Sequence, residues 1–243
     1  MSGEPELLSD GRVKCHNCGN KYERIGYHWS NGSCDYPSLP RDAEYIITGL
    51  MLGDGTLRTQ TDNPFIHIYT TNKEFLEYLD DSLGWITTGV SEYRSAEKSA
   101  SMSDGDVSDY NDVYVLQTRT MPQFNRYESW YGDGTKTLPS YLILTPDTAR
   151  IWYACSGCLN WDRRYPQSRP YVTISIRNIV DNTDHISKMF DESSFEYTPK
   201  ISEDSVRFDV GASKEFLEWI GDPLPGFEYK WAYESFDEYD DLT

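Results

Sequence analysis

A single carboxylate follows two glycines in an apolar stretch, a combination that could hold a metal ion. Residues 46–57 read IITGLMLGDGTL. Gly49 and Gly53, four residues apart, lie on one face of a helix and leave it without side chains, so a second helix could pack against it backbone to backbone. We expect Gly55 to end the helix in a left-handed turn. Asp54 would then lie among the partly negative carbonyls of the last turn, where a carboxylate needs a nearby cation. The pattern predicts a divalent-metal site, with an ordinary helix C-cap as the alternative.

A second segment shares features with the first. Residues 144–157 read LTPDTARIWYACSG, and they follow a TKTLP sequence at 135–139 and the pair Tyr141 and Leu142. Together the two segments resemble the paired motifs and the basic lead-in of the LAGLIDADG homing endonucleases, over about residues 42–230. The resemblance implies a DNA-binding hydrolase, a nuclease that cleaves phosphodiester bonds with Mg²⁺.

The resemblance also implies a fold. We expect an α+β pseudo-twofold fold, in which two αββαββα-like halves form a DNA-binding saddle, and a monomer that is an internal pseudo-dimer. The expected organisation is a zinc-knuckle-like segment and linker at 1–40, a first half at 41–143, a second half at 144–232 and an acidic tail at 233–243. The order of helical and alternating stretches is repeated after about 100 residues, which by itself indicates only a mixed α and β protein.

The second motif departs from the family pattern. The family places an acid in each motif, whereas this sequence has Asp54 in the first and Ser156, preceded by Cys155, in the second. A serine hydroxyl is a poor ligand for a hard cation. Two-metal cleavage stabilises both the attacking and the leaving oxygen. Asp54 and the carbonyl of Gly157 could therefore hold one Mg²⁺ through water, with catalysis weakened or absent. Asp162 lies close by in sequence, but nothing there places it in the site.

The resemblance assigns DNA-reading roles to the strands that follow each motif helix, because a two-stranded ribbon fits the major groove. The matching residues are Arg58, Thr59, Gln60, Asn63, His67 and Tyr69 in the first half, and Arg163, Arg164, Arg169, Thr173, Ser175 and Arg177 in the second. Arg119 is a further DNA-binding candidate. Lys136 is a catalytic candidate together with Asp54 and Ser156, because a cation could steady the charge of the scissile phosphate. The alternative for Lys136 is an ordinary surface lysine before a turn.

The overall charge is unusual for a DNA-binding protein. The chain of 243 residues has a formal net charge of −18, and a polyanion should be repelled, because affinity for DNA comes mainly from neutralised phosphates. One interpretation is a protein that never meets DNA. The other is a halophilic protein, in which salt screens charges within about 3 Å at 1 M. Arginines cluster in the middle third and could make a saddle locally positive, or could form surface ion pairs. These are Arg119, Arg126, Arg150, Arg163, Arg164, Arg169 and Arg177, together with Lys136.

Cysteines near the N-terminus have the spacing of a zinc site. Cys15 and Cys18 form a CxxC, Gly19 follows at the turn, and His28 and Cys34 come next. Three thiolates and an imidazole suit tetrahedral Zn²⁺, and metal binding would supply the folding energy of so short a segment. Tyr22, Tyr27 and Trp29 could cover the metal. The alternative is a reduced or disulfide-paired set. Cys155 and Cys158 form a second CxxC, for which packing inside the motif helix is the favoured interpretation.

Local patterns predict the remaining elements. We expect Asp42 to cap the first motif helix, Asn72 to cap a helix at 73–83 and Ser213 to cap one at 214–220. Further helices are expected at 121–130 and 181–190, and strands at 65–71, 85–93, 113–119, 171–177, 195–201 and 206–210. Residues 95–111 are rich in Ser and Asp and are expected to form a mobile loop. No apolar run is long enough for a membrane span, and the start does not resemble a signal peptide.

Three functional hypotheses follow. The first is a homing endonuclease with reduced activity, either free-standing or intron-encoded, in the cytoplasm of a high-salt cell or encoded by its virus or mobile element. The second keeps the saddle without the chemistry, as a DNA- or RNA-binding regulator or intron-splicing helper. The third is a zinc-stabilised acidic interaction module. Ser156 is the residue that separates the first hypothesis from the second.

Overall fold

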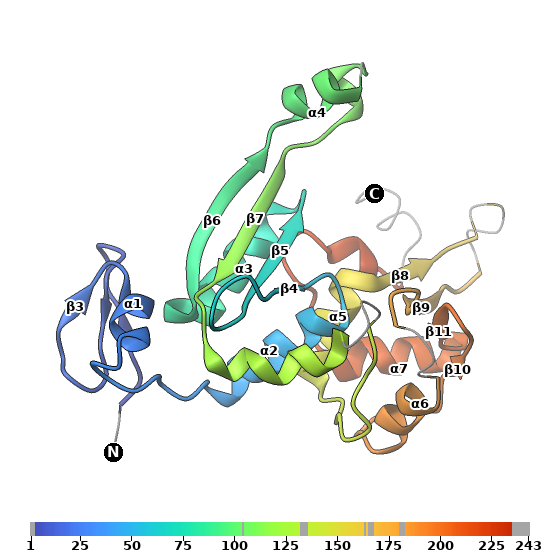
Figure 1. Ribbon diagram of the computed structural model, residues 1–243. Coiled ribbons are helices and arrows are strands. Elements are labelled where there is room, and N and C mark those ends of the chain that lie inside the picture. The colour runs from blue at the N-terminus through green and yellow to red at the C-terminus, as the bar shows by residue number, and fades with distance from the viewer. Residues whose placement is uncertain are drawn as a thin grey trace. The chain divides into compact units, whose positions relative to one another are not determined.

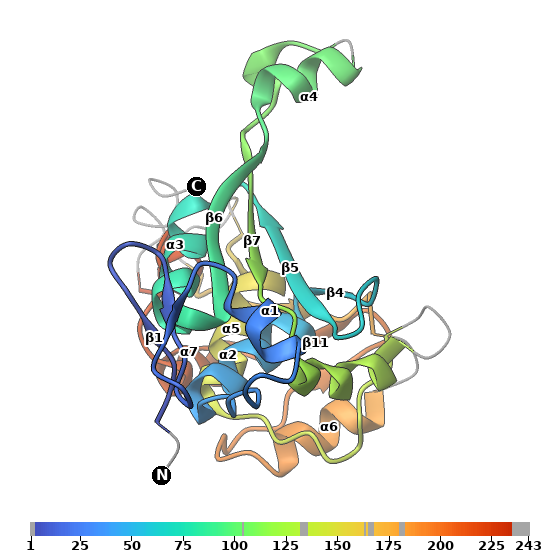
Figure 2. The same ribbon diagram turned by 60° about the vertical axis from the view of Figure 1, so that its left-hand side comes forward.

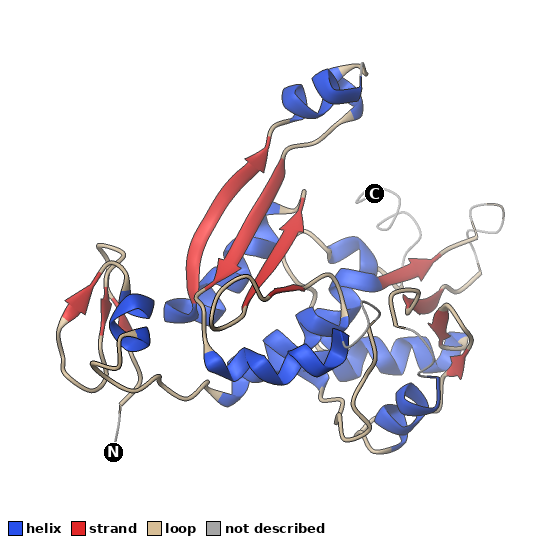
Figure 3. Ribbon diagram, viewed as in Figure 1, coloured by secondary structure: helices blue, strands red, loops and turns tan. Residues whose placement is uncertain are grey.

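The computed structural model shows two compact units (Figures 1 and 3). It describes residues 3–103, 105–131, 136–162, 164, 168–179 and 183–234. The first unit consists of residues 1–44 and 55–126, and the second of residues 45–54 and 127–243. None of the described helices combines the length and apolar character that a membrane span requires.

The same order of elements occurs twice along the chain. The first series is α2 (Arg41–Leu52), β4 (Thr56–Arg58), β5 (Phe65–Thr70), α3 (Lys73–Leu83), β6 (Thr87–Arg94) and β7 (Val113–Thr118). The second is α5 (Pro146–Ser156), β8 (Gly157–Asn160), β9 (Tyr171–Ser175), α6 (Thr183–Asp191), β10 (Lys200–Ile201), β11 (Ser205–Arg207) and α7 (Val210–Ile220). The antiparallel sheets have the orders β4-β5-β7-β6 and β8-β9-β11-β10, so their topology is identical. The expected α+β repeat is confirmed.

Alternation along the strands gives the sheet of the first unit two different faces. Ile66, Ile68 and Leu116 are buried on the face that contacts α3. His67 and Gln117 are paired on the other face and are half-buried. The helix α3 contributes Phe75, Leu76, Leu79 and Leu83 to the core, and it starts as expected at Asn72, whose side chain accepts from the Phe75 amide.

The second unit buries its sheet in the same manner. Val172, Ile174 and Val206 are fully buried, and the sheet contacts α5 and α7. Phe208 and Phe216 stack with ring centroids 4.4 Å apart in this core. The helix α7 is capped by Asp209, whose side chain accepts from Ala212.

The N-terminal segment packs as part of the first unit. It contains β1 (Glu6–Leu7), β2 (Val13–Lys14), β3 (Lys21–Tyr22) and the short helix α1 (Ile25–Ser30). Trp29 of α1 is only 2% exposed, and its ring lies 5.7 Å from that of Trp85 in the 3₁₀ turn η1 (Gly84–Ile86). Gln123, in the 3₁₀ helix η3 (Pro122–Tyr131), donates to the carbonyl of Pro37. Both contacts tie the segment to the body of the unit.

The expected mobile loop at 95–111 contains helical structure instead. Helix α4 (Ala96–Ser103) and the 3₁₀ turn η2 (Val107–Asp109) lie at the tip of the β6-β7 ribbon (Figure 2). Ser95 Oγ accepts from the Lys98 amide, and the Asp112 carboxylate accepts from the Ala96 amide. Ser and Asp therefore satisfy the first turn of a helix here, and their abundance was wrongly interpreted as a sign of disorder.

Three further expectations on local structure are wrong. The first motif helix begins at Arg41, so Asp42 lies in its first turn and is not the cap. Ser213 lies inside α7, where its hydroxyl donates to the Asp209 carbonyl and accepts from the Val172 amide. Gly55 is absent from the glycines with positive φ, because the chain passes from the turn at Gly53 and Asp54 directly into extended backbone at β4. The hairpin β10-β11 is also shorter than expected, at 200–201 and 205–207.

Candidate active site and candidate zinc site

The two motif helices, α2 and α5, pack against each other along a seam. At Gly49 and Gly53 of α2 this seam leaves no room for a side chain. A Cβ atom added to Gly49 would lie 2.6 Å from the Thr148 carbonyl oxygen and 2.7 Å from the Ile151 Cβ, both on α5. A Cβ on Gly53 would overlap the Cβ of Cys155. Real Cβ atoms do not approach so closely, which explains why glycine occupies both positions. The close approach expected from the glycine spacing is confirmed, and so is the packing role of Cys155.

Asp54 lies in the turn just after the C-terminal end of α2, and it is exposed. The surrounding protein desolvates the carboxylate and raises its pKa, while Lys230 and then Lys136 oppose this shift. Burial, followed by the Asp54 carboxylate, raises the pKa of the neighbouring Cys155 thiol to about 12. This shift favours the thiol form of Cys155.

Lys136 is a buried cation, not a surface lysine. It is 6% exposed, and its Nζ donates to the carbonyls of Leu52 and Gly53, each at 3.2 Å. These carbonyls belong to the end of α2, where a positive charge complements the helix dipole. Burial lowers the pKa of Lys136 to about 8, against the attraction of Asp54 and Cys155. The structure thus places Lys136 beside Asp54.

Lys230 makes the matching interaction on the second motif helix, and sequence reasoning missed it. It is 7% exposed, and its Nζ donates to the Ala154 carbonyl of α5 at 2.6 Å. Burial lowers its pKa, and the attraction of Cys155, Cys158 and Asp54 opposes this. The available signal was its position, since Lys230 follows Lys136 by about one repeat length and is the last lysine of the sequence.

The donor set at the seam suits one divalent ion better than two. Asp54 supplies a carboxylate, whereas Ser156, the half-buried last residue of α5, supplies only a hydroxyl. Gly157 begins β8, and its amide donates to the Tyr153 carbonyl. Among the described residues, the one group of three or more neighbouring His, Cys, Asp or Glu side chains that could hold a metal ion lies in the N-terminal segment. One carboxylate could share a hydrated Mg²⁺ with the phosphate oxygens of a nucleic acid.

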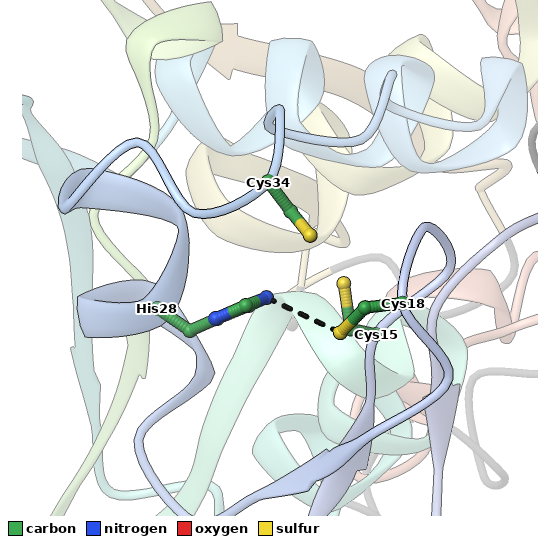
Figure 4. A group of neighbouring side chains, drawn as sticks. All are labelled: Cys15, Cys18, His28 and Cys34. Atoms are coloured by element: carbon green, nitrogen blue, oxygen red, sulfur yellow. Dashed lines mark hydrogen bonds between the residues drawn. The ribbon is translucent and has the colours of Figure 1, made fainter.

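The predicted zinc ligands come together. The ligand atoms of Cys15, Cys18, His28 and Cys34 all lie within 4.8 Å of one another and point to a common centre (Figure 4). Cys18 Sγ and His28 Nε2 are 3.6 Å apart, which agrees with the separation of about 3.6 Å expected between a sulfur and a nitrogen ligand of tetrahedral zinc. The donor set and its spacing therefore fit Zn²⁺.

The surroundings of this cluster also suit a metal. A backbone hydrogen bond from Asn20 lowers the pKa of Cys18, whereas burial raises that of Cys34 to about 11. Gly19 makes the expected turn, with φ +73° and its amide bonded to the Cys15 carbonyl. Tyr22 stacks on His28 with ring centroids 4.1 Å apart. Tyr27, in contrast, is 71% exposed and does not cover the cluster as we expected.

Candidate DNA-reading residues of the first unit divide into two kinds. His67 lies between Gln117 Oε1 at 2.8 Å and the Tyr69 hydroxyl at 2.9 Å, on the face of the sheet opposite α3. Arg58 is on β4, and Gln60 is exposed just after it. Arg119 differs, because its Nε donates to the Trp85 carbonyl and burial lowers its pKa. Its side chain is held by the fold.

Three of the arginines predicted in the second unit are described, Arg164, Arg169 and Arg177; all three are exposed, and two of them form ion pairs. Arg164 pairs with Asp162 at 3.0 Å, and Arg177 pairs with Asp204 at 3.5 Å. Arg169 is exposed, and Arg163 lies outside the described residues.

Two cations on the outer face of the second sheet were missed. The register places Lys200, Arg207 and Thr173 side by side on that face. The Arg207 guanidinium lies 4.1 Å from the centroid of the Tyr171 ring. Alternation with the buried Val206 could have identified Arg207 in the sequence.

The chain contains two repeats, each with a motif helix followed by a four-stranded antiparallel sheet, and the two motif helices pack against each other. This arrangement defines a class of α+β proteins with two motifs. Residues 44–214 match the sequence model of the LAGLIDADG DNA endonuclease family, and the chain belongs to this family. The solved structure of the homing endonuclease I-WcaI bound to its DNA recognition sequence is similar in fold, with a TM-score of 0.65 and 12% identity, over 86% of this chain and 92% of that one. The expected family and fold are confirmed.

A curated relative is similar over a shorter stretch. The uncharacterized protein MJ1098 of Methanocaldococcus jannaschii is 30% identical over 125 residues, which make up 50% of this chain and 46% of that protein. The chain thus spans about half the length of this relative.

Proposed function

We propose that the chain is a site-specific, Mg²⁺-dependent DNA endonuclease of homing type with reduced activity. The observation that carries this proposal is the position of Asp54 beside two buried lysines, at the seam of two motif helices. A carboxylate with two cations can bind a metal ion and stabilise charge on the same phosphate. The DNA recognition sequence bound in the I-WcaI structure supports the choice of substrate.

Each residue has a distinct role in this proposal. Asp54, with the Gly157 carbonyl and water, would hold the Mg²⁺, which supplies Lewis acidity and an activated water when bound. Lys136 has three N–H donors, and two of them donate to the carbonyls of Leu52 and Gly53, so the third is available for a phosphate oxygen. Lys230 bonds to the Ala154 carbonyl and retains donors on the other side of the seam. Both lysines are held in place before substrate arrives, which lowers the reorganisation needed in the transition state.

DNA would be read by the outer faces of the two sheets. We propose that residues 41–143 and 144–232 each contact one half of a long asymmetric site, as a monomer. The first face offers Arg58, Gln60, His67 and Tyr69, and the second offers Arg164, Arg169, Arg177, Lys200 and Arg207. With a net charge of −18, binding would depend on salt conditions that screen the acidic remainder, as in a high-salt cell.

A second candidate function is supported by Ser156. Loss of one motif acid could leave a DNA- or RNA-binding regulator or splicing helper on the same fold. The two candidates make different predictions for one experiment. Duplexes enriched by the full-length protein from a random pool in molar KCl are incubated with Mg²⁺ and analysed for cut strands.

Cleavage by the wild type that disappears in Asp54→Asn supports the endonuclease. Binding without cleavage, in both the wild type and Ser156→Asp, supports the binding protein. A wild type that retains no duplex at any salt concentration contradicts both candidates.

A further inference from the structure

A groove lies between the N-terminal segment and the sheet of the first unit. Its volume is about 550 Å³, and helix α1 contributes Gly26, Tyr27 and Ser30 to its lining. The opposite wall includes Thr88 and Gln117. Gln117 is also the hydrogen-bond partner of His67 on the outer face of the sheet. The groove is therefore continuous with the face to which we assign DNA reading.

Helix α1 lies against the end of this sheet. A Cβ on Gly26 would be 3.8 Å from the Thr120 hydroxyl, just after β7, and Trp29 is buried against Trp85. With Trp29 turned inward, Tyr27 is left 71% exposed. Figures 1 and 2 both show α1 beside the lower end of the β6-β7 ribbon.

Arg24, at the start of α1, is an exposed cation for which the described part of the chain provides no acidic partner. The other arginine of the N-terminal segment, Arg12, pairs with Asp10, and Lys14 pairs with Glu6 at 3.1 Å. Among the described residues, no carboxylate forms an ion pair with Arg24. An unpaired arginine beside an exposed tyrosine, with hydroxyl and backbone donors nearby, is the chemistry that contacts a phosphate backbone.

Zinc bound at the predicted site would order the helix that carries these side chains. His28 is a ligand in the middle of α1, between Tyr27 and Trp29. A helix of six residues does not persist alone in water, so the metal and the packing of Trp29 must fix its orientation.

We propose that α1 is a zinc-ordered DNA-contact helix, which extends the footprint of the first sheet by binding the sugar–phosphate backbone through Arg24 and Tyr27. This inference rests on the proposed binding of duplex DNA. Glu23 also lines the groove, and its negative charge opposes the same contact.

The test compares single charge changes in the full-length, zinc-loaded protein. The probe is a fluorescein-labelled duplex enriched by the wild type from a random pool, and its Kd is measured as a function of KCl concentration. Arg24→Ala should weaken binding about five- to tenfold and reduce the salt slope by about 1, because one phosphate contact is lost. Glu23→Gln should tighten binding. Lys14→Ala removes the same charge from a paired lysine outside the groove, so its Kd should match that of the wild type.

A second readout separates contact from folding. Zinc content should be unchanged in all three variants, and a hydroxyl-radical footprint with Arg24→Ala should lose protection at one end only. Equal Kd and salt slope for Arg24→Ala and Lys14→Ala, with a wild type that binds, would overturn this inference alone. A wild type that binds no duplex would overturn the proposed function together with it.

Discussion

Lys136 and Lys230 make the same contact at the ends of the two motif helices. Each donates from a buried Nζ to backbone carbonyls of the last turn, at Leu52 and Gly53 in α2 and at Ala154 in α5. Each also attracts Asp54. Only the first motif has an acid at this position, because the second has Ser156, whereas a lysine lies at the end of both helices. The site is thus asymmetric in its carboxylates and symmetric in its lysines.

Asp54 is expected to be essential for cleavage and dispensable for binding. Asp54→Asn keeps the shape and removes the charge that holds a metal, so Mg²⁺-dependent cleavage should fall at least about 100-fold. Duplex affinity measured with Ca²⁺ should stay within a few fold. Cleavage gels and anisotropy titrations test the two statements separately. Undiminished cleavage by Asp54→Asn would rule out the role of this carboxylate.

A carboxylate at position 156 is expected to raise cleavage. Ser156→Asp would restore a second anionic ligand at the end of α5, next to two lysines that can offset its charge. We expect the single-turnover cleavage rate to rise about tenfold or more. Ser156→Asn is the matched control, because it has the same size without the charge, and it should not raise the rate.

Lys136 should give stability a characteristic pH dependence. Its pKa falls from an ordinary 10.5 to about 8 in the folded protein, so the unfolded chain binds more protons between these values. Stability rises with pH wherever the unfolded state binds more protons. The difference in free energy of unfolding between wild type and Lys136→Met should therefore increase in favour of the wild type from about pH 8 to 10.5, by up to about 3 kcal/mol.

Urea titrations at several pH values measure this difference. The lost carbonyl contacts of Lys136→Met add an offset that does not vary with pH. A difference that stays flat across the window would show that Lys136 titrates normally.

The seam should tolerate no side chain at the glycine positions of α2. Gly53→Ala would place its Cβ against that of Cys155, and overpacking typically costs about 1–3 kcal/mol. Adding Cys155→Gly should recover part of this loss, so the pair should be non-additive in a double-mutant cycle. Gly211→Ala is the control, because this helical glycine is exposed and has only the Asp209 side chain within 4 Å, at 3.6 Å. Its stability should be unchanged or slightly higher.

The N-terminal segment should bind one Zn²⁺ per chain. Metal analysis of the purified protein would test this, and Cys34→Ser should lose the metal and lower the thermal stability of the first unit. Cys158→Ser changes an exposed thiol away from the cluster and should retain zinc. Equal zinc content in the two variants would contradict the assignment of Cys34 as a ligand.

The sequence identified the features that depend on local spacing. The glycines of α2 and the cap at Asn72 could be predicted because each depends on the geometry of one helix, and the four zinc-type ligands could be predicted because their residue types and spacing match a known ligand set. The ends of short strands and the helix α4 could not, because the contact of the Ala96 amide with Asp112 depends on residues brought together by the β6-β7 ribbon.

The active-site environment was only partly accessible from sequence. Asp54 was recognised from its motif, but the burial of Lys136 and the existence of its counterpart Lys230 depend on long-range packing. The same is true of Arg119. Its charge led us to predict a DNA contact, whereas in the structure its side chain donates to the Trp85 carbonyl. A sequence shows which side chains are charged, whereas only the fold shows which groups they are paired with.

The pairing of Gly53 with Cys155 makes the two motif helices complementary but unlike. Gly49 and Gly53 leave space on α2, and Ile151 and Cys155 of α5 fill it. Two copies of α2 placed together in this geometry would leave an empty space, and two copies of α5 would collide. Neither helix is therefore shaped to pair with a copy of itself, and the seam selects contact between α2 and α5 over self-association through either helix.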